Sequence, residues 1–294
     1  MTSDADYPRT TRGAFQESRS AELSEDDVAA LVRVLDLQER SPAVQRLRDW
    51  TLERLELADG ESAVDVGCGT GSEVRRMALR VGDSGRATGV DTNPRLLAVA
   101  ADRTPSHSSA RLSLASASDL PFADGSVDAL RCERVFQHLE HPQAAADEIA
   151  RVLRPGGRAV VVDSDWGTFV TVTHEPEIMR RVQEWGWHTQ WPNPFAGRHL
   201  RAQLRTAGLE VDDDIGSSAL VLPPEALLGC GPLGRTVESA QDDGAITPDE
   251  GGRLVSGVEA SAQRGDAFVA VTIFAVVART GLSSGPGSPP SSAA

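Results

Sequence analysis

The sequence predicts an α/β fold in which a doubly wound, mostly parallel sheet carries helices on both of its faces. Three observations support this prediction: strands alternate with helices, a glycine-rich turn follows the first strand, and a carboxylate ends the second. Alternation favours a parallel sheet, because parallel strands need long crossover connections that helices usually supply. The 294 residues are enough for one large α/β domain with additional cap segments.

Five short apolar or β-branched runs are predicted to be the core strands, namely 63–66, 87–90, 111–114, 127–132 and 158–163. A helix is expected over 142–153, and Pro155-Gly156-Gly157 closes it. Two later runs, 209–211 with its continuation and 268–278, are predicted to be the last strands.

The N-terminal part of the chain is predicted to contain an arm and two helices. Residues 1–20 are polar and irregular, which is typical of a flexible arm. Within 21–60, Ser24 and Asp27 have the spacing of a capping box, and Pro42 suits the first turn of a second helix.

The turn after the first strand reads Val64-Asp65-Val66-Gly67-Cys68-Gly69-Thr70-Gly71. Glycine lets the backbone turn sharply and lets a ligand approach it closely. A helix is predicted from Ser72, so its first N–H groups point at whatever lies over the glycines. Asp91 ends the next strand, where a carboxylate can accept hydrogen bonds from two ribose hydroxyls. Together these features indicate a nucleotide-type site at the carboxyl edge of the sheet.

The glycine spacing separates two kinds of nucleotide site. The dinucleotide fingerprint is G-x-G-x-x-G, whereas here the third glycine comes one place early, which disfavours a nicotinamide dehydrogenase. The turn instead resembles motif I of the class I S-adenosylmethionine (SAM)-dependent methyltransferases. The resemblance extends over about 61–162 and includes, in the same order, the segments 89–91, 117–128 and 148–157.

The resemblance implies a seven-stranded sheet whose last two strands form an antiparallel edge pair. It also divides the chain: 61–165 would be the SAM-binding core, and 166–280 would hold the acceptor or cap segments and the last strands. Within the second part, 164–196 and about 223–266 are interpreted as helical caps over the sheet edge. The Ser-, Pro- and Gly-rich tail 281–294 is expected to be disordered.

The resemblance further implies SAM as the cofactor and S-adenosylhomocysteine as its product. The glycines would pass close to the methionine part, Asp65 would hold the turn, and Asp91 would bind the ribose. The residues expected at this site are Asp65, Gly67, Gly69, Gly71, Asp91, Thr92, Ser118, Asp119, Cys132 and Glu133.

Two positions of this site depart from the family or allow a second interpretation. The Gly-Asp pair that ends the third strand in the family is Ala115-Ser116 here, so the adenine would meet Ser118 or Asp119 instead. Asp119 is equally typical of a turn residue. Glu133, next to Cys132, either faces the sulfonium end of SAM or forms an ion pair with a neighbouring arginine.

Candidate catalytic residues are His138, Asp163 and His188. His138 follows the fourth strand, where a histidine serves as a general base in some relatives. Asp163 ends the fifth strand at the edge where an acceptor would bind, and His188 lies among tryptophans. Each also has a structural interpretation, as a capping residue or a surface residue.

Four of the five tryptophans fall in one short stretch, which suits either a flat, apolar ligand or the core of a small cap. Two aromatic residues of the N-terminal arm are further candidates, because such residues fold over the site in several relatives. The residues expected to contact the acceptor are Tyr7, Phe15, Trp166, Trp185, Trp187 and Trp191.

Composition excludes several classes of partner. A net charge of −14 argues against nucleic-acid binding, which needs a basic surface. The three cysteines, Cys68, Cys132 and Cys230, suit a reducing cytoplasm and have no metal-ligand spacing, so no metal site is expected. The longest apolar run, 268–278, is too short to span a membrane. Monomer and homodimer both remain open.

The sequence therefore predicts methyl transfer from SAM to a small, aromatic or apolar metabolite of natural-product type, by in-line displacement onto O, N or C. One alternative is a SAM-fold protein repurposed for another reaction, such as a cyclisation, or a cofactor-binding module. Another is a protein methyltransferase, which would need an open groove that two cap segments disfavour.

Overall fold

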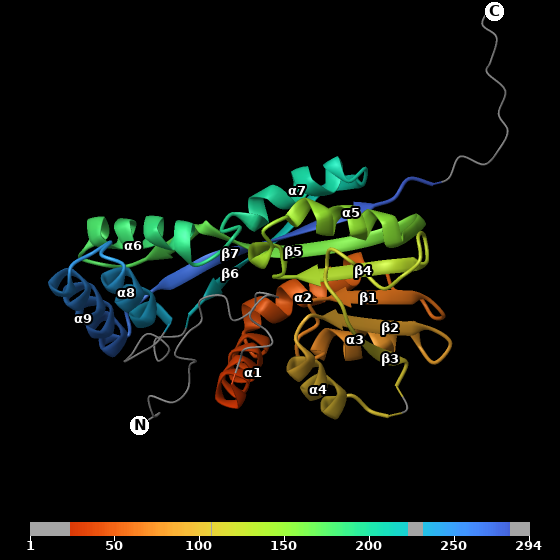
Figure 1. Cartoon of the computed structure of the whole chain (residues 1–294), viewed down its shortest axis with the longest axis horizontal. Coiled ribbons are helices and arrows are strands. Elements are labelled where there is room, and N and C mark those ends of the chain that lie inside the picture. The colour runs from red at the N-terminus through yellow and green to blue at the C-terminus, as the bar shows by residue number, and fades with distance from the viewer. Residues whose placement is uncertain (1–23, 107, 223–231, 283–294) are drawn as a thin grey trace, which may run out of the picture.

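The computed structural model describes residues 24–106, 108–222 and 232–282. Their sheet has seven strands in the order β3-β2-β1-β4-β5-β7-β6 (Figure 1). Strands β1 to β5 run parallel, and β7 is antiparallel to both of its neighbours, which confirms the predicted sheet. The strands are β1 (Ser62–Val66), β2 (Arg86–Asp91), β3 (Ala110–Leu114), β4 (Val127–Glu133), β5 (Leu153–Thr171), β6 (Glu210–Val221) and β7 (Val269–Arg279).

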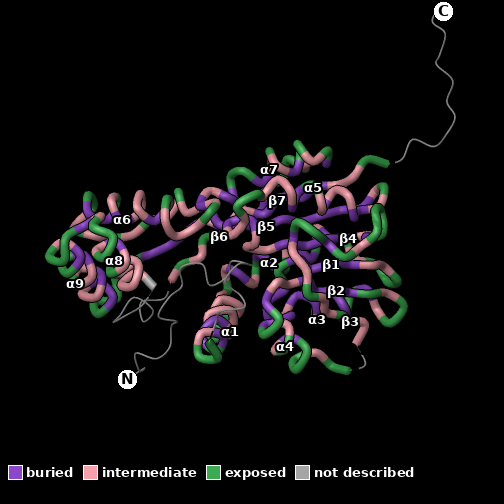
Figure 2. Tube along the Cα trace, viewed as in Figure 1, coloured by how far each residue is buried: buried purple, intermediate pink, exposed green. Residues whose placement is uncertain are grey.

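Helices cover both faces of this sheet, and a separate apolar core lies under each layer (Figures 1 and 2). Helices α5 (Pro142–Val152) and α7 (Ala196–Thr206) pack on one face, against alternate residues of β1, β4 and β5. Helices α2 (Pro42–Arg54) and α3 (Ser72–Val81) pack on the other face, and α4 (Pro94–Arg103) lies beside β2 and β3. The other alternate residues of the strands face this second layer, as the two-residue repeat of a strand requires.

The predicted N-terminal helices are present. Helix α1 (Glu25–Glu39) begins with a complete capping box, in which Ser24 and Asp27 satisfy each other's main-chain N–H groups. Pro42 is the first residue of α2. The buried side of α2 carries one charged residue, Arg48, among apolar neighbours.

Strand β5 is much longer than the predicted run 158–163. It continues to Thr171, so the first part of the segment interpreted as a cap is strand. The pairing with β7 shifts register between Asp165 and Val170, and the Thr168 hydroxyl there accepts a hydrogen bond from the Thr272 N–H (2.9 Å). The local sequence combines strand-forming residues, Trp166 and 168–171, with Asp165 and Gly167, so both intrinsic propensity and pairing with β7 favour the extended conformation.

Beyond the sheet core, three helices form a compact group that we call the cap: α6 (Pro176–Thr189), α8 (Pro232–Asp242) and α9 (Pro248–Arg264). The cap lies at the far end of the long strands β5 and β7, on the left in Figure 1. It has an apolar core of its own, made of Ile178, Met179, Val182, Val237, Ala240, Ile246 and Leu254. Within the described ranges, no helix is both long enough and apolar enough to cross a membrane.

Candidate functional site

The glycine turn between β1 and α3 has the backbone conformation that its sequence predicts. Gly67, Gly69 and Gly71 have φ angles of 72°, 51° and 75°, a region that other residues rarely adopt. A side chain at Gly67 would overlap Val135, which follows β4. Gly71 is the N-cap of α3 and supplies no side-chain cap, so the first N–H groups of that helix need another partner.

Asp91 connects the glycine turn to the end of β2. Its Oδ2 accepts a hydrogen bond from the Gly69 N–H (2.8 Å), and its Oδ1 accepts one from the Asn93 N–H (2.9 Å). Burial raises the pKa of Asp91, although these main-chain N–H groups oppose the rise. The Thr92 N–H also donates to this carboxylate, whose two oxygens have about four lone-pair positions in all, so a ligand hydroxyl can still be accepted. The assignment to a ribose stays a prediction.

The loop after β3, where the adenine was expected, is compact and exposed. The Asp119 N–H donates to the Ser116 carbonyl (3.2 Å), and the hydroxyls of Ser116 and Ser118 lie 3.0 Å apart. Ser118 and Asp119 are both exposed. Because β2 and β3 are adjacent and parallel, this loop lies at the same sheet edge as Asp91. The structure therefore leaves the adenine contact of Ser118 or Asp119 as a prediction.

A buried cluster of charges lies where β1 and β4 end and α3 begins. It consists of three arginines and three carboxylates, namely Arg48, Arg131, Arg134, Asp65, Glu73 and Glu133. Arg48 grips Glu133 with two nitrogens, Nε at 3.0 Å and Nη2 at 3.3 Å. Arg48 Nη1 also lies 3.6 Å from Glu73, so α2 is fixed to both β4 and α3.

Glu133 lies at the centre of this cluster and forms ion pairs with its arginines. This agrees with the second interpretation of Glu133 given above, an ion pair with a neighbouring arginine. Burial opposes its ionisation, but the guanidinium groups of Arg131, Arg48 and Arg134 hold the pKa of Glu133 well below its usual range. Asp65 lies opposite Arg131 in the β1–β4 ladder, 3.0 Å from its Nη1. Burial raises the pKa of Asp65 to about 6 despite that arginine. Asp65 thus supports the end of β1 from beneath the turn.

Cys132 pairs with Val66 at the carboxyl end of β1, so its main chain lies at this edge, and its contact with SAM stays a prediction. Its side chain is fully buried in the core beneath α5 and α7. Neighbouring residues of a strand point to opposite faces, so Arg131 and Glu133 face the charge cluster and Cys132 faces away from it. Burial also raises the pKa of the Cys132 thiol well above its ordinary value, which disfavours the thiolate form.

Asp163 caps the short 3₁₀ helix η2 (Phe136–His138), which follows β4. Its carboxylate is completely buried and accepts hydrogen bonds from the N–H groups of Gln137 (3.2 Å) and Ser164 (2.7 Å). Burial raises the pKa of Asp163 to about 7. These hydrogen bonds favour a capping role for Asp163 over a catalytic one, because both of its carboxylate oxygens accept main-chain N–H groups.

His138 lies on η2, and burial followed by the nearby Arg134 cation lowers its pKa to about 4. The imidazole is therefore neutral at physiological pH, and both causes make it harder to protonate than an exposed histidine. Arg134, which precedes η2, has a φ of 56°, unusual for a residue with a side chain. Such strain is held in place where the surrounding structure demands it, often at functional sites.

Three of the four predicted tryptophans come together next to η2. Trp166 and Trp191 are stacked, with ring centroids 4.0 Å apart and an angle of 18° between the planes. The Trp187 Nε1 donates to the Trp166 carbonyl (3.3 Å), and its ring meets the edge of Phe195 at 5.4 Å. We call Trp166, Trp187, Trp191 and Phe195 the aromatic group.

Trp185 is not part of the aromatic group, which corrects its assignment to the acceptor. Its Nε1 donates to the Asp243 carboxylate (3.1 Å), and its ring packs on the core of the cap with Ile178 and Val182. These three residues are spaced at helical intervals along one stripe of α6. Trp187 is two residues further along and therefore faces another side of the helix.

A cavity of about 360 Å³ borders the aromatic group. Its lining includes the predicted residues His188 and Trp191, and the full set is Glu140, His188, Thr189, Trp191 and Pro192. Tyr7, Phe15 and Cys230 lie outside the described residues.

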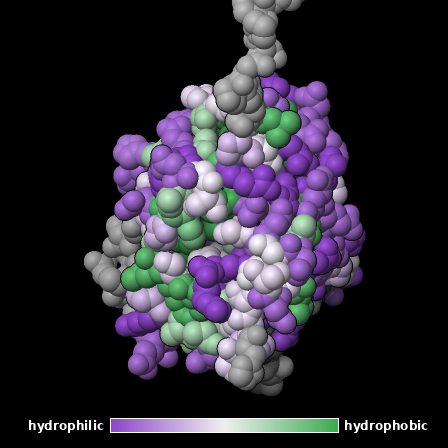
Figure 3. Space-filling view, turned by 90° about the vertical axis from the view of Figure 1, so that its right-hand side faces the viewer, coloured by the Kyte–Doolittle hydropathy of each residue, from purple (hydrophilic) through white to green (hydrophobic). Residues whose placement is uncertain are grey.

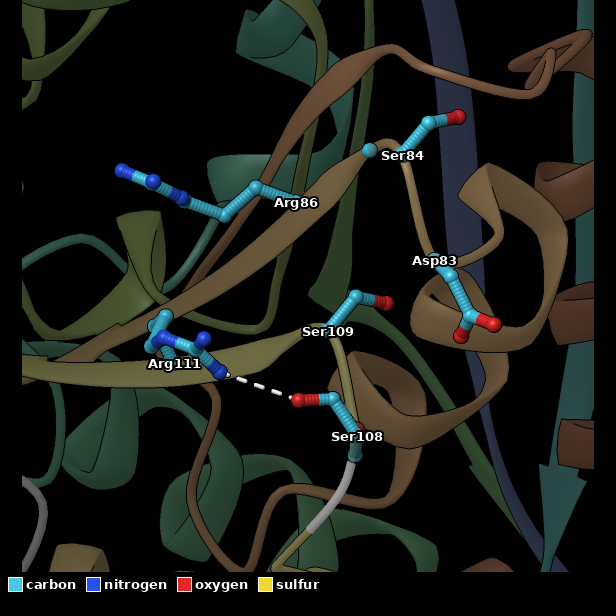
Figure 4. Close-up of a pocket in the computed structure, with 7 residues that line it drawn as sticks. Asp83, Ser84, Arg86, Ser108, Ser109 and Arg111 are labelled. Atoms are coloured by element: carbon cyan, nitrogen blue, oxygen red, sulfur yellow. Dashed lines mark hydrogen bonds between the residues drawn. The ribbon is translucent and has the colours of Figure 1, made fainter.

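A second cavity, of about 430 Å³, lies at the opposite edge of the sheet, at the amino ends of β2 and β3 (Figure 4). Its polar groups are already used by the fold. The hydroxyls of Ser84 and Ser109 donate to Asp59 (3.0 Å) and to the Ala78 carbonyl (3.1 Å), and Arg111 donates to the Ser108 carbonyl (3.0 Å). Hydrophilic residues predominate on this side of the molecule (Figure 3). We assign this cavity no part in the site.

Several residues of the site were missed by the sequence reasoning, among them Arg48, Glu73, Gln137 and Phe195. Arg48 carried a signal, because it occupies the apolar stripe of α2 between Val44 and Leu52. Gln137 carried no comparable signal, since only the fold shows that it is buried just after β4.

Comparisons with known proteins agree with this geometry. A family model described as "Methyltransferase domain" matches residues 64–161. An uncharacterized 37.1 kDa protein in transposon TN4556 of Streptomyces fradiae is 30% identical over 260 residues, which cover 88% of this chain and 74% of that protein. A demethylmenaquinone methyltransferase of Staphylococcus aureus (strain Newman) is 31% identical over 175 residues, covering 55% and 73%.

Among solved structures, the complex between the Haloferax volcanii Trm112 methyltransferase activator and the putative methyltransferase contains a chain with the same fold. The TM-score is 0.55 at 21% identity, over 92% of this chain and 98% of that one. The family model, the relatives and the sheet topology lead to one conclusion: the chain belongs to the class I SAM-dependent methyltransferases.

Proposed function

We propose that this enzyme methylates a small aromatic or apolar metabolite that docks against the aromatic group. The observation that carries the proposal is the stacked pair Trp166 and Trp191, which stands at the carboxyl edge of the sheet beside a cavity of about 360 Å³. Flat indole surfaces favour flat or apolar ligands. The Staphylococcus aureus relative is named for an acceptor of this kind, a quinone.

The glycine turn and Asp91, at the carboxyl edge of the sheet, fit SAM. The turn at Gly67, Gly69 and Gly71 has no side chains to obstruct a ligand, and α3 directs unsatisfied N–H groups toward it. Asp91 would bind the ribose hydroxyls, and Ser118 or Asp119 would meet the adenine. When bound, SAM supplies an electrophilic methyl group attached to a sulfonium.

The protein's task is then mainly to place the acceptor and to exclude water. The aromatic group would fix the orientation of the acceptor's flat ring, and the cavity beside His188 would bind the substituents of that ring. An acceptor hydroxyl must lose its proton during transfer, and His138 is the candidate base; its imidazole is neutral, but the lowered pKa makes it a weaker base than an exposed histidine. A net charge of −14 further favours a small molecule over a nucleic acid as the acceptor.

The test is an acceptor screen of the purified enzyme with SAM, using phenols, naphthols and quinols against aliphatic alcohols of similar size. The readouts are release of S-adenosylhomocysteine and a product heavier by one methyl group. We expect turnover with flat aromatic acceptors. Turnover without consumption of SAM, or methylation of aliphatic alcohols alone, would contradict the proposal.

Two tryptophan variants supply the matched comparison. Trp191→Leu removes one ring of the stack and should raise the acceptor KM about tenfold, because the ligand loses its flat contact surface. Trp185→Leu removes the same kind of ring from the cap core and should lower Tm while leaving the acceptor KM of the folded enzyme unchanged. Equal KM values for both variants would show that the stack does not contact the acceptor.

A further inference from the structure

Gln137 connects the cofactor part of the site to the aromatic group. The residue lies in η2 directly after β4, and only 5% of it is exposed. Its side-chain Oε1 accepts a hydrogen bond from the Trp166 indole N–H at 2.8 Å. Its Nε2 lies 3.5 Å from the Arg134 carbonyl, so one amide spans from the end of β4 to the aromatic ring on β5.

Gln137 is itself held firmly by its main chain. Its N–H donates to the buried Asp163 carboxylate (3.2 Å), and its carbonyl accepts from the Asn193 N–H (3.2 Å). The Asn193 side chain also donates to the Phe136 carbonyl (3.2 Å), which fixes the chain before α7 to η2. The amide therefore has little freedom, and its carbonyl oxygen points where the Trp166 ring must lie.

The Trp166 ring depends on this contact for its orientation. Stacking on Trp191 fixes its plane, but a half-turn about the Cβ–Cγ bond would leave the indole in much the same plane with its N–H on the opposite side. The hydrogen bond to Gln137 fixes the remaining direction, because the indole has a single polar atom, which is a donor only. The main chain of Trp166 is held separately, by its N–H to the Pro194 carbonyl (2.9 Å).

We propose that Gln137 is a positioning residue that sets the orientation of the acceptor through Trp166, without touching the acceptor or SAM. This inference rests on the proposed function, because it assumes that the aromatic group holds the acceptor. A flat ligand on a rotated ring would present its nucleophile off the line of transfer. Small misplacements of this kind cost roughly ten- to a hundredfold in rate.

The experiment compares three variants with the wild type. Gln137→Met keeps the size of the side chain and removes the acceptor oxygen. Gln137→Glu keeps an oxygen that can accept the indole N–H. Gln183→Met is the matched control, because the Gln183 side-chain amide likewise bonds to β5, where it donates to the Phe169 carbonyl (3.3 Å), but it belongs to the cap. Each variant is measured for acceptor kcat and KM, SAM affinity by calorimetry, and near-ultraviolet circular dichroism.

For Gln137→Met we expect kcat/KM for the acceptor to fall at least about tenfold. SAM affinity should stay within twofold, and the tryptophan bands of the circular dichroism spectrum should change. Gln137→Glu should restore most of the activity and the bands, and Gln183→Met should behave as the wild type. Equal loss in Gln137→Met and Gln137→Glu would indicate a purely steric role and would overturn the inference.

The two proposals fail in different ways. If the wild type turns over and Trp191→Leu impairs it but Gln137→Met does not, the positioning role is wrong and the proposed function stands. If the wild type methylates no aromatic acceptor, the proposed function is wrong. Tryptophan bands unchanged in Gln137→Met would overturn the positioning role with or without an acceptor, because they would show that the ring does not depend on this amide.

Discussion

Replacing Asp163 by Asn tests whether burial governs the charge of this residue. The Asp163 carboxylate is completely buried, and its oxygens accept main-chain N–H groups of Gln137 and Ser164. Burial raises its pKa in the folded protein to about 7. In the unfolded chain an aspartate has a pKa of about 3.9. Between these values the folded protein keeps a proton that the unfolded chain has released.

The sign of the effect on stability follows directly. Because the folded state binds the proton more tightly, the free energy of unfolding falls as pH rises from about 4 to about 7, with a limiting slope of about 1.4 kcal/mol per pH unit. Between pH 5 and pH 8 the wild type should lose about 2–3 kcal/mol through Asp163 alone. Asp163→Asn has no proton to lose at this position, so its unfolding free energy lacks this decline.

The assay is urea unfolding of the wild type and Asp163→Asn at pH 5 and pH 8. The difference between the two proteins cancels the contributions of other titrating groups, such as Asp65 and His138, provided that they do not couple to the substitution. The stability advantage of the wild type should shrink by about 2–3 kcal/mol at the higher pH. A difference that does not change with pH would mean that Asp163 ionises normally, and the reasoning from burial would be refuted.

Three further predictions concern the site. Gly67→Ala should destabilise the fold by at least about 2 kcal/mol and abolish SAM binding, because the backbone φ is positive at this position and Val135 occupies the space that a side chain would need. Thermal unfolding measures the loss of stability, and calorimetry measures the loss of SAM binding. Arg48→Met should cost about 2–3 kcal/mol in urea unfolding by leaving Glu133 short of a cation, and adding Glu133→Gln should recover part of the loss. If His138 accepts the acceptor's proton, kcat should fall only as pH approaches about 4, where the imidazole becomes charged, and an acidic limb near pH 6.5 would contradict this.

The fold was largely predictable because its signals are local. Each core strand is a short run that contains apolar or β-branched residues, the turn at Gly67 needs glycine, and the start of α1 is fixed by a capping box at Ser24 and Asp27. The extension of β5 to Thr171 was not predictable in this way. Asp165 and Gly167 interrupt the strand pattern there, and the strand continues past them by pairing with β7, about a hundred residues later.

The cofactor part of the site was also easier to predict than the rest. The glycine turn and Asp91 are close in sequence, whereas Arg48 and Glu133 are 85 positions apart and meet only in the fold. Trp185 shows what local spacing can still indicate within one helix. Trp185 and Trp187 are about 200° apart around a helix, so helical spacing alone separates a ring in the cap core from one that faces the sheet edge.

The central claim is that SAM binds at the carboxyl edge between the glycine turn and Asp91, and calorimetric titration tests it most directly. The wild type, Asp91→Ala and, as a control, Asp83→Ala at the opposite edge would be titrated with SAM and with S-adenosylhomocysteine. We predict binding of both by the wild type and Asp83→Ala, and a loss of about 1–3 kcal/mol in Asp91→Ala as charge-assisted hydrogen bonds disappear. Folded wild type that binds neither compound, or an Asp91→Ala variant with unchanged affinity, would contradict the claim.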